Sequence, residues 1–92
     1  MTEGIDTKKM AVVVLNWNGL ALLEQFLGNW EALTPDYAEL IIVDNGSTDG
    51  SLDYVSRTFP HVRCIAFAEN YGFAEGYNRA IGMLQHDYIV LL

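Results

Sequence analysis

The fold is decided by a stretch that begins Met10-Ala-Val-Val-Val-Leu15 and continues Asn16-Trp-Asn18. Six consecutive apolar residues, three of them β-branched, are typical of a strand that is buried on both faces. A second run of this kind, Leu40-Ile-Ile-Val43, leads directly into Asp44 and Asn45. Strands without a polar face occur mainly in parallel sheets that helices cover on both sides.

Three amphipathic segments separate the apolar runs and predict helices. Apolar residues recur at three- and four-residue steps between Leu20 and Leu33, between Leu52 and Phe59, and between Phe73 and Leu84. Further strands are predicted from Val62 to Phe67 and from Tyr88 to Leu92. The residues expected to face the core from the helices are Leu23, Phe26, Leu27, Trp30, Leu33, Leu52, Val55, Phe59, Phe73, Tyr77, Ala80, Ile81 and Leu84. Right-handed crossovers then predict an α/β fold, a doubly wound, mostly parallel four-stranded sheet of order 3-2-1-4 with helices on both faces.

Length and composition limit the possible functions. Ninety-two residues suffice for one core, which we place in residues 10–92 behind a flexible N-terminal segment, residues 1–9. A net charge of −7 argues against binding nucleic acid, and no apolar run approaches the ~20 residues of a membrane-spanning helix. The single cysteine, Cys64, is expected to be a small buried hydrophobe in a cytoplasmic protein. Neither His61 nor His86 has a second ligand at metal-binding spacing.

Polar clusters follow three of the predicted strands. They are Asn16 to Asn18 after the first, Asp44 and Asn45 after the second, and Glu69 to Gly72 after the third. In a doubly wound sheet, ligands bind beyond the carboxyl ends of the strands, here between the first and the fourth. We therefore predict that these clusters line a ligand site.

The first two clusters suit a planar base. The amides of Asn16 and Asn18 and the ring of Trp17 could read and stack on a base, although Asn18 could instead cap the following helix and Trp17 pack beneath it. The Asp44 carboxylate could accept a hydrogen bond from the ring N–H of a uracil-like or thymine-like edge. For Asp49 we favour the simpler role of satisfying exposed amides of the second helix.

The third cluster opens the segment from Asn70 to Arg79. Gly72 and Gly76 give backbone freedom, and the amides of Asn70 and Asn78 could contact a ribose or phosphate. Gly76 could equally permit close packing of the helix on the sheet, and Arg79 could be either a phosphate contact or a solvated surface charge.

Three motifs occur in a characteristic order and spacing. They read Val12-Val-Val-Leu-Asn-Trp-Asn-Gly19, Val43-Asp-Asn-Gly-Ser-Thr-Asp-Gly-Ser51 and Glu69-Asn-Tyr-Gly-Phe-Ala-Glu-Gly-Tyr-Asn-Arg-Ala-Ile81. Together they resemble the amino-terminal half of a family 2 glycosyltransferase, particularly of the rhamnosyltransferase-like branch, from about Met10 to Leu92. The resemblance implies the nucleotide-binding half of a GT-A fold. It further implies that Asn16 to Asn18 lie at the base and ribose of a UDP- or dTDP-sugar, that Asp44 reads the pyrimidine, and that Asn70 to Asn78 help form the donor pocket.

The same resemblance implies the activity of the complete enzyme. That enzyme would transfer a sugar from a nucleotide diphosphate to a hydroxyl of a glycan or lipid-linked acceptor, in polysaccharide or cell-surface glycan synthesis. It would use Mg²⁺ or Mn²⁺ held by an Asp-x-Asp-like motif after the fourth strand, and a catalytic base from its second half. The printed sequence stops at Leu92, before both.

We accordingly expect a truncated GT-A-like domain without catalytic or metal-ligating residues of its own. Such a domain would bind a nucleotide sugar, transfer no sugar alone, and self-associate through exposed strand edges. In the complete enzyme it could work at the inner face of the membrane. The alternative is a non-catalytic α/β module that binds a nucleotide or a protein partner.

Overall fold

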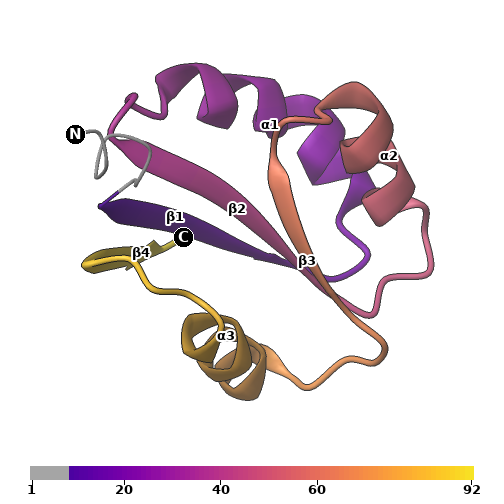
Figure 1. The fold of residues 1–92 in the computed structure, drawn as a ribbon. Helices are drawn as coiled ribbons and strands as arrows, with labels where there is room; N and C mark the ends of the chain where they lie inside the picture. Colours follow the sequence, from indigo (N-terminus) through magenta and orange to yellow (C-terminus); the bar gives the residue numbers. More distant parts are fainter. Residues whose placement is uncertain (1–8) are drawn as a thin grey trace.

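The computed structural model describes residues 9–92, which form a parallel sheet with helices on both faces (Figure 1). In chain order the elements are β1 (Met10–Asn16), α1 (Leu20–Leu33), β2 (Ala38–Asn45), α2 (Ser51–Thr58), β3 (Arg63–Phe67), α3 (Phe73–Gly82) and β4 (Tyr88–Leu91). The four strands are all parallel and lie in the order β3-β2-β1-β4. The predicted doubly wound sheet is confirmed. The flexible segment predicted at residues 1–9 lies, except for its last residue, outside the described residues.

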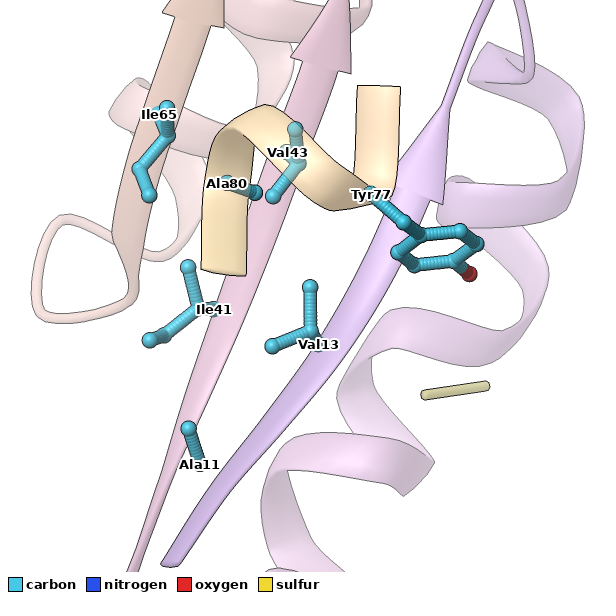
Figure 2. Close-up of a cluster of buried hydrophobic side chains, with 7 residues drawn as sticks. All are labelled: Ala11, Val13, Ile41, Val43, Ile65, Tyr77 and Ala80. Carbon is cyan, nitrogen blue, oxygen red and sulfur yellow. The ribbon is translucent and has the colours of Figure 1, made fainter. Parts of the chain in front are cut away.

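One hydrophobic core lies between the sheet and α3 (Figure 2). Its buried residues are Ala11, Val13, Ile41, Val43, Ile65, Tyr77 and Ala80. Figure 2 shows Tyr77 and Ala80 projecting from α3 over the strands. The Tyr77 hydroxyl accepts a hydrogen bond from the Leu15 N–H at 3.4 Å and donates one to the carbonyl oxygen of Leu92. This side chain therefore links α3 to the ends of β1 and β4.

A second core lies on the opposite face, beneath α1 and α2. Its buried residues are Val14, Leu23, Leu27, Leu40, Ile42, Val55 and Val62. The neighbours Val13 and Val14 belong to different cores, since successive side chains of a strand point to opposite faces. Each fully buried aliphatic side chain stabilises the fold by roughly 1.5–3 kcal/mol. β1 and β2 are thus buried on both faces, as their unbroken apolar runs predict.

Some helix residues expected in the core lie at the surface. Leu33 is 81% exposed and Phe73 is 74% exposed, because they are the terminal residues of α1 and α3, where the cores no longer reach. Phe26 is 36% exposed and stacks on Trp30, with 6.0 Å between ring centroids. α3 ends at Gly82 and not at Leu84. Within residues 9–92, no helix combines the length and apolarity needed to cross a bilayer.

β2 is longer than its apolar run. It extends through Asp44 and Asn45, which the sequence places in the turn that follows. Both side chains are therefore held by the sheet itself. Asp44 pairs in register with Asn16 on β1 and with Ala66 on β3, so it stands in the middle of the carboxyl edge.

Candidate functional site

The carboxyl ends of β1 and β2 bring Asn16 and Asp44 together. Asn16 Nδ2 donates to Asp44 Oδ1 at 3.0 Å, and the Ser47 N–H donates to Asp44 Oδ2 at 3.0 Å. Asn16 Nδ2 also lies 3.3 Å from Ser47 Oγ. Asn16 is 6% exposed and Asp44 is 3% exposed. The carboxylate is thus fixed by partners from two elements before any ligand arrives.

The turns after β1 and β2 are hydrogen-bonded to each other. The Asn18 N–H donates to Ser47 Oγ at 2.8 Å, and the Thr48 N–H donates to Asn18 Oδ1 at 2.8 Å. The residue before α1 is Gly19, with no side-chain cap. Capping of α1 by Asn18, one of the two roles left open for this residue, therefore does not occur. Instead Asn18 joins the two turns, and its positive φ of 50° helps to place its amide there.

Asp49 connects the starts of two helices. Its Oδ2 accepts from the Leu20 N–H of α1 at 3.0 Å, and its Oδ1 accepts from the Ser51 N–H of α2 at 2.9 Å and from the Ser51 hydroxyl. The hydrogen bond from the Ser51 hydroxyl is the main cause that lowers the pKa of Asp49, and both backbone N–H groups lower it further. Its predicted role at the second helix is confirmed, and it serves the first helix as well.

Asn45 faces the other way and holds the loop that precedes α3. Its Nδ2 donates to the Gly72 carbonyl oxygen at 3.0 Å, and its Oδ1 accepts from the Tyr71 N–H at 2.9 Å. The side chain is 2% exposed. Asn70 Oδ1 in turn accepts from the Gly72 N–H at 2.7 Å, and Gly72 has a φ of 84°, which only glycine adopts readily. Both asparagine side chains thus bind the protein's own backbone.

Gly76 owes its position to the same packing. A Cβ at this residue would lie 2.9 Å from Asn45 Nδ2 and 3.2 Å from Leu15 Cδ1. Close approach of α3 to the sheet, the alternative weighed for this glycine, therefore explains it.

Three candidate residues take no part in the hydrogen bonds around Asp44 or around Asn45. They are Trp17, Asn78 and Arg79. Trp17 follows Asn16 in the chain and is 55% exposed, so its ring is accessible to a ligand. Asn78 is exposed on α3. The Arg79 guanidinium carbon lies 3.8 Å from the centroid of the Tyr71 ring, and Arg79 Nε donates to Glu75 at 2.8 Å. Arg79 is therefore engaged on the surface of α3.

Ser47 is the residue that sequence reasoning did not include among the ligand-binding candidates. The signal was present, since a serine three residues after an aspartate commonly forms a turn in which the carboxylate accepts a backbone N–H. Its connection to Asn16 and Asn18 was not readable, because those partners are about 30 residues away in the chain.

The remaining titratable side chains were considered as a reactive thiol and as metal ligands. Cys64 is half-buried, and burial raises the pKa of its thiol, to which the negative charge of Asp44 adds. Within residues 9–92, no three or more His, Cys, Asp or Glu side chains are grouped so as to hold a metal ion.

A cavity of about 740 Å³ lies at the opposite, amino-terminal edge of the sheet. Glu39 lines it, with its Oε1 2.9 Å from His86 Nε2 and 3.8 Å from Arg63 Nη1. The length of the strands separates this cavity from the pair of Asn16 and Asp44.

A doubly wound parallel sheet with polar side chains at the carboxyl ends of its central strands is the architecture in which many α/β proteins bind nucleotides. Residues 11–92 match the model of the family described as glycosyl transferase family 2. The chain belongs to this family, and the resemblance seen in its three motifs is confirmed.

Two glycosyltransferases are similar to this chain, one in sequence and one in solved structure. The chain is 31% identical over 78 residues to the N-acetylglucosaminyl-diphospho-decaprenol L-rhamnosyltransferase of Mycobacterium tuberculosis, matching 85% of this chain and 25% of that protein. A solved structure of the mannosyltransferase PcManGT from Pyrobaculum calidifontis, in complex with GDP-Man and Mn2+, superposes with a TM-score of 0.68 and 28% identity. That match covers 84% of this chain and 24% of the mannosyltransferase. The chain thus spans about a quarter of the length of these relatives, and its GT-A-type fold and rhamnosyltransferase-like relationship are confirmed.

Proposed function

We propose that this chain forms the donor-nucleotide-binding part of a glycosyltransferase that uses a UDP- or dTDP-sugar. The observation that carries the proposal is the Asp44 carboxylate, held at the carboxyl edge of the sheet by Asn16 Nδ2 and the Ser47 N–H. Membership of glycosyl transferase family 2 supports sugar transfer and favours an enzyme over a non-catalytic binding module.

The chemistry of Asp44 suits a pyrimidine that carries a ring N–H. A carboxylate offers about four lone-pair positions, and the protein uses one on each oxygen. The remaining positions can accept the ring N–H of uracil or thymine, whereas the unprotonated ring nitrogen of cytosine presents a lone pair and is repelled. The exposed ring of Trp17 offers a surface on which the base stacks.

The residues of the loop before α3 act indirectly in this proposal. Asn45 and Asn70 bind backbone groups, so they shape the loop beside the donor pocket, and Gly72 and Gly76 allow that shape. Asn78 is the exposed polar side chain of α3 that could contact the donor.

The remaining features of the activity are drawn from the relatives. The name of the mycobacterial relative includes a decaprenol-diphospho substrate, which supports a lipid-linked or glycan acceptor, polysaccharide or cell-surface glycan synthesis, and work at the cytoplasmic face of a membrane. The Mn2+ in the mannosyltransferase complex supports a divalent cation, Mg²⁺ or Mn²⁺, bound by ligands from outside residues 9–92. The 92 residues alone are therefore expected to bind the donor nucleotide without transferring its sugar. Self-association stays a prediction, which sedimentation over a range of concentrations tests.

Isothermal titration with nucleoside diphosphates, in the presence and absence of Mn²⁺, tests the proposal. We expect UDP and dTDP to bind and Asp44→Ala to weaken UDP binding by roughly 10- to 100-fold, as for loss of a hydrogen bond to a charged group. Asp44→Asn, which conserves shape, should also weaken it. Asp53→Ala is the matched control, because Asp53 is an exposed aspartate paired with Arg57 on α2.

Three outcomes would contradict this assignment. If Asp44→Ala binds UDP as tightly as the parent chain, or if ADP competes equally with UDP, Asp44 does not read the base. Tighter binding of GDP than of UDP would show that the site prefers guanine, the base of the donor in the mannosyltransferase complex, to a pyrimidine.

A further inference from the structure

We propose that the Ser47 hydroxyl is a specificity-determining group of this site, which donates a hydrogen bond to a carbonyl oxygen of the pyrimidine next to the ring N–H bound by Asp44. This inference rests on the proposed function and assigns a role to a residue outside the three candidate clusters drawn from the sequence.

The hydrogen bonds of Ser47 leave only its proton free. Ser47 Oγ accepts from the Asn18 N–H at 2.8 Å and from Asn16 Nδ2 at 3.3 Å. A hydroxyl has two lone pairs and one proton, so both acceptor positions are occupied. Among residues 9–92, this hydroxyl donates no hydrogen bond to another protein atom. Two donated hydrogen bonds also polarise the O–H group and make it a better donor.

The hydroxyl stands beside the Asp44 carboxylate in a fixed arrangement. Asn16 Nδ2 contacts both Ser47 Oγ and Asp44 Oδ1, and the Ser47 N–H donates to Asp44 Oδ2. Ser47 is half-buried, and its hydrogen bond with Asn18 lies on the exposed side of the cluster. The protein therefore holds a buried acceptor, Asp44, next to a half-buried donor, Ser47, at the carboxyl edge.

This pair requires a base edge on which an N–H lies beside an acceptor atom. Uracil and thymine carry a ring N–H between two carbonyl oxygens, so an acceptor beside a donor meets an N–H beside a carbonyl. Cytosine offers a ring nitrogen lone pair between a carbonyl oxygen and an amino group, and it cannot satisfy Asp44 and Ser47 through its ring nitrogen and carbonyl. When Asp44 binds a ring N–H, the pair thus favours uracil or thymine over cytosine, which can meet it only through its amino group and ring nitrogen.

Thio-substituted nucleotides test the role of the hydroxyl. Sulfur is a weak acceptor, so 2-thio-UDP and 4-thio-UDP each weaken one carbonyl position. We expect the parent chain to bind UDP roughly 2- to 12-fold more tightly than one of the two analogues, the range of a single neutral hydrogen bond. Ser47→Ala should lower the affinity for UDP and abolish this preference, and Ser47→Thr should restore it. Ser56→Ala, which removes an exposed hydroxyl of α2, should leave the preference unchanged.

The ratio of affinities separates recognition from structure. If Ser47 only orders the turn, Ser47→Ala lowers binding of UDP and of both analogues by the same factor, and the inference is wrong. Any effect of sulfur on the ring N–H is common to both proteins and cancels in this comparison. Equal affinity of the parent chain for UDP and both analogues overturns the inference without any variant, so it stays testable even if Ser47→Ala fails to fold. If the parent chain binds neither UDP nor dTDP, the proposed function itself is wrong.

Discussion

Replacement of Asn45 by alanine tests whether the loop before α3 is held by a single side chain. The change removes two hydrogen bonds, one to the Gly72 carbonyl oxygen at 3.0 Å and one from the Tyr71 N–H at 2.9 Å. Each is partly buried and contributes about 0.5–1.5 kcal/mol net, so we expect a loss of about 1–3 kcal/mol in the free energy of unfolding. Small domains unfold with about 5–15 kcal/mol, so the variant should still fold.

Urea denaturation followed by circular dichroism measures this loss. With an m-value of roughly 1–1.5 kcal/mol/M for a chain of this size, the midpoint should fall by about 0.7–3 M. Amide hydrogen exchange of Tyr71 should accelerate as well, because its N–H loses its acceptor. Asn29→Ala is the matched control, since Asn29 lies exposed on α1 and its replacement should change stability by less than about 0.5 kcal/mol.

A midpoint within about 0.2 M of the parent chain, together with unchanged protection of the Tyr71 amide, would refute this reasoning. The loop would then owe its conformation to its own backbone and to Gly72, and the Asn45 hydrogen bonds would be a consequence of that conformation.

Two further predictions concern the helices around the site. Gly76→Ala places a Cβ 2.9 Å from Nδ2 of Asn45, a side chain that two hydrogen bonds hold in place, and should lower the free energy of unfolding by about 1–3 kcal/mol. Gly82→Ala, with nothing within 4 Å of the new Cβ, should be neutral or stabilising by up to about 1 kcal/mol. Equal urea midpoints for Gly76→Ala and Gly82→Ala would contradict the packing role of Gly76. The pKa of Asp49 is lower in the folded protein than its ordinary 3.8, so the stability it contributes is fully present above the unfolded pKa and is lost as the pH falls through the folded pKa. Asp49→Asn should therefore lower the free energy of unfolding at neutral pH and flatten its decline below about pH 4, and parallel curves for the two proteins would show that the charge is not involved.

Much of the fold could be predicted from local patterns. The apolar runs of β1 and β2 contain no polar alternation, which fixes burial on both faces, and right-handed crossovers then leave few possible strand orders. The same patterns could not place Leu33 and Phe73, because helical periodicity identifies the inner face of a helix but not how far the core extends along it.

The placement of the candidate residues at the carboxyl edge of the sheet is confirmed, whereas the hydrogen bonds among them could not be predicted. Asn16 and Asp44 were both expected at the carboxyl ends of adjacent strands, and the parallel register makes them direct neighbours. Asn45 was grouped with Asp44 as a ligand contact, whereas its side chain binds Tyr71 and Gly72. Ser47 was not among the predicted ligand contacts, because its hydrogen bonds to Asn16 and Asn18 join segments about 30 residues apart.

Short stretches of sequence encode strand burial, crossover handedness and the three motifs, so a doubly wound parallel sheet of family 2 glycosyltransferase type, and the edge at which its polar residues lie, could be predicted from them. Which of those polar residues contact each other became apparent from the three-dimensional arrangement. Adjacent side chains on a strand point to opposite faces, so Asp44 turns toward Asn16 and Ser47 on the α1 and α2 side, and Asn45 turns toward the loop of α3. The partners of both come from segments distant in the chain, which no local pattern specifies.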